Sequence, residues 1–517
     1  MAPTMTGSNG LISNVTEGLL RAVKVSMLTR DFGAKFSSDV GILQVSAEDY
    51  DRSQSVQHID DFISHSWKTS RWAKFMAVCL VYNMTAAAAA SWLAAVVLLV
   101  LELDSVSILP RSIHFEAYHA GEILHHTYGG WGMFLCPIIF LFVGVFWQDM
   151  HRPRLAFVDK FCIHQTDPRL KRAGIRGLAG FLRHSERLVV LWTPAYFERL
   201  WCAYELASWI YLRKSHICFM PVSFAALAGL CSLGLFAQVL TTLVAEALMG
   251  QSPIWFVLLI AWILCLLITV PARKHVLELT QLPSQLSEFS VQKTHCLCCD
   301  VGHVHPQTSQ AIPCDRALVY DALKERYLKI PETSELSLSE TEELPLPHLH
   351  FFDQQVRERI NSHLLTMGGY RLSYRDALIM SSPTFWYYVA RATYLESMPP
   401  IEWVRWALFV ASLVFAAWPM VFEVIISLTG YYERVLVGSR EDNVLKTLAT
   451  LVTASSAFCI AVSLWALLAL PFFYFQSPLP LILASAILGM LTVIRFRVFT
   501  WRKLRRFLSK KCLEFQG

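Results

Sequence analysis

Charged side chains are scarce in this sequence. Only 16% of its 517 residues are Asp, Glu, Lys or Arg, and 54% are hydrophobic, whereas soluble domains carry roughly 25% charged residues. This composition excludes an ordinary soluble protein and predicts an integral membrane protein. The formal net charge is +5 and the basic residues are spread out, apart from a run near the C-terminus. We therefore expect no nucleic-acid partner.

A regular cysteine framework is also absent. The 13 cysteines are scattered over apolar and polar stretches alike, which excludes a secreted disulfide scaffold and predicts reduced thiols or metal ligands. Residues 1–60 contain no apolar core long enough for a signal peptide. We expect residues 1–54 to form a partly ordered N-terminal lead-in in the cytosol.

Long uncharged runs predict where the chain crosses a bilayer. The stretch from Phe75 to Leu101 has no charged residue, which is enough to cross a hydrocarbon core of about 30 Å at about 1.5 Å per residue. A second apolar run predicts that residues 75–148 form a first membrane hairpin. Similar runs predict a second hairpin at residues 217–272 and further membrane helices at residues 404–494.

The number of spans is expected to be six or seven. Seven would place the basic tail, residues 495–517, outside, whereas the positive-inside tendency requires it inside. We favour six full spans, with the apolar segment 479–494 re-entrant or interfacial and both termini in the cytoplasm. The lipid bilayer is then the first expected partner.

Acidic residues within the apolar runs are few. Glu246 and Glu423 are the clearest cases, and intramembrane acids are functional candidates. Glu246 lies at the end of its run and is expected to reach water, which leaves Glu423 as the deeper of the two. The scarcity of such charges argues against an ion-coupled transporter.

The first external loop is rich in histidine. His119, Glu122 and His126 have the spacing of one helix face, and histidines in such a place can bind metal or respond to pH. The alternative is a set of interfacial polar residues without a chemical task.

Two soluble stretches, residues 55–72 and 154–215, have the pattern of a parallel β/α fold. One short strand ends in Asp159 and Lys160, a second runs from Arg187 to Trp192, and helical patterns follow each. Such units place a ligand crevice beyond the carboxyl ends of their strands. Because the first hairpin returns the chain to its starting side, both stretches can form one domain that the hairpin interrupts.

Five pieces of these stretches occur in the order typical of one family. They are Asp61-Phe62-Ile63-Ser64-His65-Ser66, Phe157-Val158-Asp159-Lys160, Leu188 to Pro194, Tyr196-Phe197 and Trp201-Cys202-x-x-Glu205-Leu206. Together they resemble the Toll/interleukin-1 receptor (TIR) family, its plant and protist branches most. The piece from Asp159 to Gln165 is also similar to fungal heterokaryon-incompatibility domains.

The resemblance implies an α/β domain with a parallel sheet of three strands or more, joined to an all-α membrane region of six or seven helices. The chain departs from the family after Ser215, where it enters the membrane and leaves the fourth and fifth strands without a clear counterpart. A sheet of three strands would have an open edge. We expect the soluble region 273–400 to cover it.

The resemblance also implies a signalling function and a candidate reaction. In TIR enzymes that cleave NAD between nicotinamide and ribose, the catalytic acid matches Glu205, so the chain is a candidate NAD nucleosidase (a hydrolase). Many TIR domains are adaptors instead, and Glu205 is then a helix-surface residue in a module that associates with itself or with other TIR-like domains. A third reading is a channel or transporter gated by ligand at this domain.

The residues expected to hold NAD flank the carboxyl ends of the strands. They are Ser64, His65, Ser66, Trp67, Asp159, Lys160, Trp201 and Cys202. The alternative for the hydroxyls is to cap the next helix. The loop after Asp159 is basic, with Lys160, Arg169, Lys171 and Arg172, which suits an acidic partner or phosphates as well as it suits a solvated loop.

A Cys/His cluster lies in the region 273–400. Its members are Cys296, Cys298, Cys299, His303, His305 and Cys314. Thiolate and imidazole are the ligands that zinc prefers, and a structural zinc would staple this small region. The spacing is not that of a standard zinc finger, so unligated cysteines in a loop are the alternative.

Overall fold

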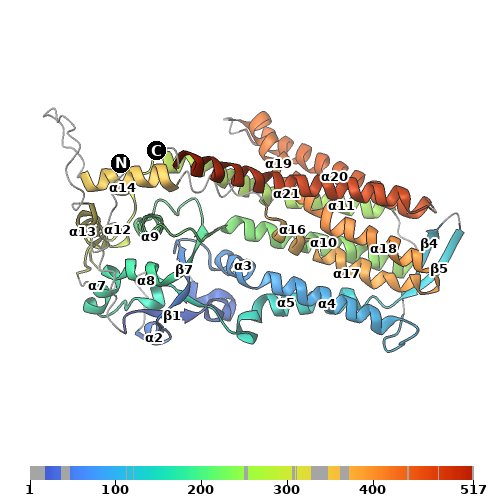
Figure 1. Ribbon diagram of the computed structural model, residues 1–517, viewed down its shortest axis with the longest axis horizontal. Helices are drawn as coiled ribbons and strands as arrows, with labels where there is room; N and C mark the ends of the chain where they lie inside the picture. Colours follow the sequence, from blue (N-terminus) through green and yellow to red (C-terminus); the bar gives the residue numbers. More distant parts are fainter. Residues whose placement is uncertain are drawn as a thin grey trace.

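The computed structural model describes residues 18–36, 47–111, 113–119, 122–249, 254–304, 309, 311–327, 347–360, 372–438, 442–475 and 477–514. Figure 1 shows an elongated molecule. An α/β domain and several short helices occupy one end, long helices run along the long axis, and a small β-hairpin lies at the opposite end. We refer to these as the domain end and the hairpin end.

The α/β domain contains a mixed sheet of six strands, in the order β2-β1-β6-β3-β7-β8. The strands are β1 (Arg21–Lys24), β2 (Gln54–Ser55), β3 (Ile59–His65), β6 (Leu155–Phe157), β7 (Ser185–Trp192) and β8 (Ile217–Pro221). Strands β6, β3, β7 and β8 are parallel, and β1 and β2 are antiparallel additions at one edge. In chain order the four parallel strands are arranged 2-1-3-4, as in doubly wound sheets.

The central strand of this sheet comes from the far side of the first membrane hairpin. β3 precedes the hairpin, whereas its neighbours β6 and β7 follow it; Phe62 is paired with Phe157 on one side and with Leu188 on the other. All three side chains are fully buried. The stretches before and after the hairpin therefore form one sheet.

Both edges of the sheet differ from the sequence expectation. β1 and β2 belong to residues 1–54, whose described part thus contributes to the sheet rather than leading into it. At the other edge, residues 217–221 form β8 instead of opening the second membrane hairpin. The edge beside β7 is therefore filled by a strand, and the expectation that region 273–400 covers it is wrong.

The helices of the domain follow the strands. They are α1 (Ser26–Thr29), the 3-10 segment η1 (Arg30–Phe36), α2 (Ala47–Asp51), α3 (Arg71–Tyr82), α6 (Asp159–Cys162), α7 (Pro168–Arg176), α8 (Leu178–His184) and α9 (Leu200–Tyr211). α8 and α9 contact each other and β3, while α3 contacts β8 and leads directly into the first membrane helix. The hairpin is thus an insertion in the crossover between β3 and β6.

Asp61 joins the three central strands. Its side chain is fully buried; one carboxylate oxygen accepts a hydrogen bond from Arg154 Nε at 2.7 Å and the other accepts one from Arg187 Nε at 2.6 Å. Arg154 immediately precedes β6, and Arg187 lies on β7. One carboxylate before the hairpin therefore binds two guanidinium groups after it.

Seven described helical stretches are long and apolar enough to cross a membrane, as expected of an integral membrane protein. They are α4 (Met84–Glu102), α5 (Trp131–Met150), α10 (Val222–Met249), α11 (Ile254–Ser287), the run Pro400–Val437 formed by α18 (Pro400–Ser412), η6 (Leu413–Ala417), α19 (Trp418–Tyr432) and η7 (Glu433–Val437), α20 (Asn443–Tyr474) and α21 (Leu479–Glu514). Their outer faces expose large apolar side chains such as Leu93, Ile138 and Leu267. Such faces suit contact with lipid tails.

The last apolar segment is a full helix, not a re-entrant one. Its membrane-length part, Leu479–Phe496, belongs to α21. Arg495, assigned from sequence to the tail, donates to Glu423 of α19. With this helix, the described residues contain seven membrane-length helices, one more than the six full spans favoured from sequence.

An eighth helical segment passes through the bundle, although its composition is less apolar. α16 (Tyr374–Met380) and α17 (Ser382–Arg391) span a length of about 27 Å at about 1.5 Å per residue. α17 packs against α4, α5 and α10, and its Trp386 donates to Ser91 of α4. The sequence placed these residues in the soluble region 273–400, and the structure packs α17 among the long helices.

This segment connects the two ends of the molecule. At its start, Arg375 and Asp376 lie near Cys218 of β8. Burial raises the pKa of Cys218, the charge of Arg375 lowers it and that of Asp376 raises it. After α17, the 3-10 segment η5 (Ala392–Ser397) carries Glu396, which accepts from the backbone N–H groups of Asp104 and Ser105 at the hairpin end. Residues 374–397 therefore run from the domain end to the hairpin end.

The two acids expected within the apolar runs are paired with arginines. Glu246 accepts from Arg391 at 3.0 Å and from the Tyr387 hydroxyl at 3.1 Å, and its side chain is only 4% exposed. The expectation that Glu246 reaches water is thus wrong. Glu423 is equally buried and pairs with Arg495. Both pairs join helices that are distant in sequence.

The histidine-rich loop is a β-hairpin, β4 (Ile113–His119) and β5 (Glu122–Tyr128). His119 is directly opposite Glu122 across the hairpin, and His126 is opposite Phe115. The expectation that these residues share one face of a helix is therefore wrong. The segment is a strand, in which successive side chains alternate between two faces.

Between α11 and α16 the described soluble elements are short. They are η3 (Val291–Lys293), α12 (Leu297–Asp300), α13 (Asp315–Tyr327), α14 (Pro347–Gln355) and η4 (Val356–Ile360). All lie at the domain end (Figure 1), and η4 contacts α9.

Substituting Asp61 tests how the interrupted sheet is held together. Asp61→Asn removes the charge that two arginines share, and we expect it to destabilise the domain by about 1.5–3 kcal/mol, the range for hydrogen bonds to a charged group, because both arginine side chains are partly exposed. Thermal unfolding of the detergent-purified protein measures this. Glu186→Gln is the control, because the Glu186–His58 pair is more than half exposed on both sides. Equal effects of the two substitutions would contradict the role of Asp61.

Candidate functional site

The carboxyl ends of β3 and β7 meet where the order of the parallel strands reverses direction. The connection from β3 leads to β6 on one side, and the connection from β7 leads to β8 on the other. Doubly wound sheets bind ligands at such a switch point. Ser64, His65 and Ser66 lie there at the end of β3, and all three are buried.

Glu205 enters this place from α9. Ser64 Oγ donates to Glu205 Oε2 at 2.5 Å, and the Tyr196 hydroxyl lies 2.6 Å from the same Ser64 Oγ. Glu205 is 7% exposed, so it is not a helix-surface residue. Tyr196, Ser64 and Glu205 form a chain of hydrogen bonds that joins β3 to the loop and helix after β7.

Burial raises the pKa of Glu205 to about 8; the hydrogen bond from Ser64 opposes this shift, and the negative charge of Asp159 adds to it. At neutral pH the carboxyl is therefore mostly protonated in this closed arrangement. A cationic group placed beside it would favour the carboxylate instead.

Three buried polar atoms beside this chain have no hydrogen-bond partner among the described residues. They are His65 Nε2, Ser66 Oγ and Lys74 Nζ. Buried polar groups are rarely left unpaired, because each costs about 1–3 kcal/mol. These three atoms are therefore available for polar contacts that the described residues do not supply.

Lys74 is the most unusual of the three. It comes from α3, is fully buried, and its ammonium lies 5.1 Å from the centre of the Trp67 ring and 5.5 Å from that of Phe36. Burial lowers the pKa of Lys74 to about 8, and the charge of Asp159 opposes this. A cation held by two rings without an anion at hydrogen-bond distance is suited to receive one.

Asp159 and Trp67 complete the cluster. Trp67 Nε1 donates to Asp159 Oδ2 at 2.9 Å, and the Trp67 ring lies 4.5 Å from that of His65. Burial raises the pKa of Asp159 above its usual value. Trp67 is therefore fixed in orientation at the mouth of the cluster.

Not every residue expected to hold NAD belongs to this cluster. The Lys160 ammonium pairs with Asp49 of α2 at 3.4 Å instead, and Trp201 donates to Asp315 of the Cys/His region at 3.3 Å. Cys202 does belong, since its thiol donates to the His65 carbonyl at 3.4 Å. Lys160 and Trp201 are thus structural contacts in the described arrangement.

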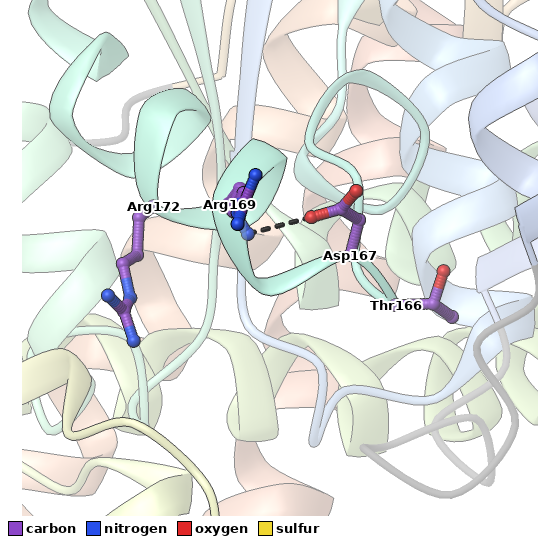
Figure 2. A pocket seen from close by; sticks show the side chains of 4 residues that line it. All are labelled: Thr166, Asp167, Arg169 and Arg172. Carbon is purple, nitrogen blue, oxygen red and sulfur yellow. Dashed lines mark hydrogen bonds between the residues drawn. The ribbon is translucent and has the colours of Figure 1, made fainter.

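The basic loop forms an open depression on the surface. Thr166, Asp167, Arg169 and Arg172 line it, and Figure 2 shows the bond between Asp167 and Arg169, with the Arg172 side chain apart from the others. Asp167 caps α7 by accepting from the backbone N–H groups of Arg169 and Leu170. Lys160 is absent from this surface because it is buried.

The Cys/His residues gather around α12. The ligand atoms of Cys298, Cys299, His303 and Cys314 all lie within 4.8 Å of one another. Cys296 Sγ lies 3.2 Å from Cys298 Sγ and belongs to a second group with Asp315. His305 lies outside the described residues.

Lys74 and Tyr196 are the members of the central cluster to which the sequence assigned no role. Lys74 borders the uncharged run of the first span, so it marked only the start of that run. Tyr196 was part of the family pattern, but its hydroxyl could be placed beside Ser64 only by the fold.

Comparison of the chain with family models, with curated proteins and with solved structures found no match. The function is therefore argued from the cluster itself.

The raised pKa of Glu205 predicts how the stability of the folded protein depends on pH. The folded protein keeps a proton on Glu205 up to about pH 8, whereas the unfolded chain releases it near the usual value of 4.5. The stabilisation that Glu205 contributes is therefore fully present below pH 4.5. It is lost as the pH rises toward 8, by up to about 1.4 kcal/mol per pH unit.

Glu205→Gln removes this dependence. Relative to the unmodified protein, we expect the variant to gain stability between about pH 5 and pH 8, as measured by thermal unfolding in detergent across that range. Glu198→Gln, at an exposed position just before α9, is the control and should leave the profile unchanged. Parallel profiles for Glu205→Gln and the unmodified protein would refute the raised pKa.

Proposed function

We propose that the chain is a multipass membrane signalling protein whose TIR-like domain binds NAD and cleaves the bond between nicotinamide and ribose. The observation that carries the proposal is the position of Glu205, a buried carboxyl held by Ser64 at the switch point of the sheet. The 2-1-3-4 order of the parallel strands supports the TIR-like assignment, since β8 supplies a fourth strand.

The chemistry of the reaction fits the groups in the cluster. The bond from ribose to the nicotinamide nitrogen breaks, its electron pair neutralises the pyridinium, and a water oxygen bonds to the ribose carbon with loss of a proton. A carboxylate stabilises the positive charge that develops on the ribose. The cationic nicotinamide ring would itself favour ionisation of Glu205 before the bond breaks.

The remaining groups suit the rest of the dinucleotide. NAD carries two negatively charged phosphates, and Lys74 is a buried cation without an anionic partner at hydrogen-bond distance. His65 Nε2 and Ser66 Oγ offer two further unpaired polar atoms beside it. In this proposal Trp67 stacks on a ring of the dinucleotide.

A non-enzymatic assembly module is the second candidate. The burial of the site favours this candidate, because Glu205 is only 7% exposed and its carboxyl already accepts a hydrogen bond from Ser64. The domain would then bind a second TIR-like domain, with the helices as its anchor. A channel or transporter is less favoured, because Glu246 and Glu423 are each paired with an arginine.

NAD turnover by the full-length protein in detergent tests the first candidate. We expect Glu205→Gln to lower the rate of nicotinamide release at least about 100-fold, because it removes the charge that stabilises the transition state. Glu198→Gln, the same chemical change at an exposed site, should keep the rate.

Turnover at background level in the unmodified protein, or equal rates for Glu205→Gln and Glu198→Gln, would exclude the enzymatic proposal. In that case, light scattering tests the assembly module, since a protein that stays monomeric at all concentrations would exclude self-association and leave only binding to a different TIR-like domain.

We also propose that the α/β domain and the C-terminus lie on the cytoplasmic side. α21 begins at the hairpin end and runs back toward the domain end (Figure 1), and the pass of residues 374–397 makes the number of passes even. The even number agrees with the basic run from Arg495 to Lys511, which the positive-inside tendency places in the cytoplasm.

Epitope tags test this topology in selectively permeabilised cells. A tag after residue 517 should be detected only after permeabilisation, and a tag inserted between His119 and Glu122 should be detected on intact cells when the protein is at the plasma membrane. Detection of both tags on the same side would contradict an even number of passes.

A further inference from the structure

The ligand atoms of four side chains near α12 all lie within 4.8 Å of one another. Cys298 and Cys299 are on α12, His303 follows it, and Cys314 precedes α13. Zinc bound by three thiolates and one imidazole, at about 2.3 Å and 2.0–2.1 Å, requires sulfur atoms about 3.8 Å apart and sulfur-to-nitrogen distances of about 3.6 Å.

The observed separations agree with this geometry. Cys299 Sγ lies 4.0 Å from Cys298 Sγ, 3.9 Å from Cys314 Sγ and 3.6 Å from His303 Nε2. Cys296 does not fit the same tetrahedron, because its sulfur is only 3.2 Å from that of Cys298. Four of the six residues singled out from sequence therefore form a complete ligand set.

The backbone around the four ligands is shaped to bring them together. Gly302 and His303 both have positive φ, 64° and 60°, and a side chain in this region costs roughly 1–2 kcal/mol. This turn places the His303 ring beside Cys299, which lies four residues earlier in the chain. Asp315 N–H donates to Cys298 Sγ at 3.2 Å, the kind of bond that supports a thiolate ligand.

The segment that carries the ligands is attached to the start of α9. His295 N–H donates to the Glu198 carbonyl at 2.6 Å, and Leu200 N–H donates to the His295 carbonyl at 3.2 Å. On the other side of the ligands, Asp315 accepts from Trp201 Nε1. The first turn of α9 is thus held from both flanks of the cluster.

We propose that Cys298, Cys299, His303 and Cys314 bind one structural zinc ion, which fixes the segment from His295 to Asp315 and thereby anchors the N-terminal end of α9. The zinc has four protein ligands and no open position, so it has a structural role and not a catalytic one. The proposal does not depend on NAD cleavage, because no ligand belongs to the Glu205 cluster.

Metal analysis of the full-length protein, purified in detergent without chelator, tests the site. We expect about one zinc per chain. Cys299→Ser and Cys314→Ser should each lose it, whereas the matched control Cys296→Ser should retain it. Zinc that is absent from the unmodified protein and not taken up on addition of one equivalent would overturn the site. Loss in Cys296→Ser together with retention in Cys314→Ser would overturn the ligand set.

A second measurement uses the unmodified protein and so does not depend on the folding of a variant. Exchange of the metal for cobalt should produce the intense visible bands of tetrahedral, thiolate-bound Co²⁺; a weak octahedral spectrum would contradict the ligand set. Chelation should increase proteolysis between residues 193 and 200, and added zinc should reverse this. Proteolysis unaffected by chelation would exclude the anchoring of α9. Glu205→Gln should keep its zinc, which separates this test from that of the enzymatic proposal.

Discussion

The buried carboxylate of Asp61 is the interaction on which the rest of the α/β domain depends. It lies on the central strand β3, before the membrane hairpin, and binds Arg154 and Arg187, which follow the hairpin. An insertion of two membrane helices in a crossover would otherwise leave β3 joined to its neighbours by backbone pairing and apolar contact alone. A charge shared by both neighbours sets which strands pair and at which register, because a shifted register would leave ions buried without partners.

The interrupted sheet is what creates the candidate site. Ser64 comes from before the hairpin, Tyr196 and Glu205 come from after it, and their hydrogen bonds form only once β3 lies beside β7. Lys74 belongs to the helix that leads into the membrane, so the site and the first span share one continuous segment, α3 and α4.

Helix α9 connects this site to the Cys/His cluster. One face carries Glu205 toward Ser64, and its first turn is bound by the segments on both sides of the cysteine ligands. The position of the carboxyl therefore depends on contacts with segments that are distant in sequence, from β3 to the start of α13. Such a helix is a rigid support for a functional group, since packing on two sides restricts its movement.

The sequence by itself determined the elements whose signal is local. The strands at 59–65 and 185–192, the helix with Glu205 and the long apolar spans are all visible as periodicity or as uncharged length. Tertiary structure alone decided the rest. β1 is too short to show a period, and β8 merges with the apolar helix after it. α16 and α17 are too polar to be recognised as part of the helix bundle, because their polar side chains are satisfied by other helices. The same division holds for the site. Residue type and position in the sequence identified most of its residues, but only the pairing of distant strands brought Lys74 and Tyr196 to Glu205.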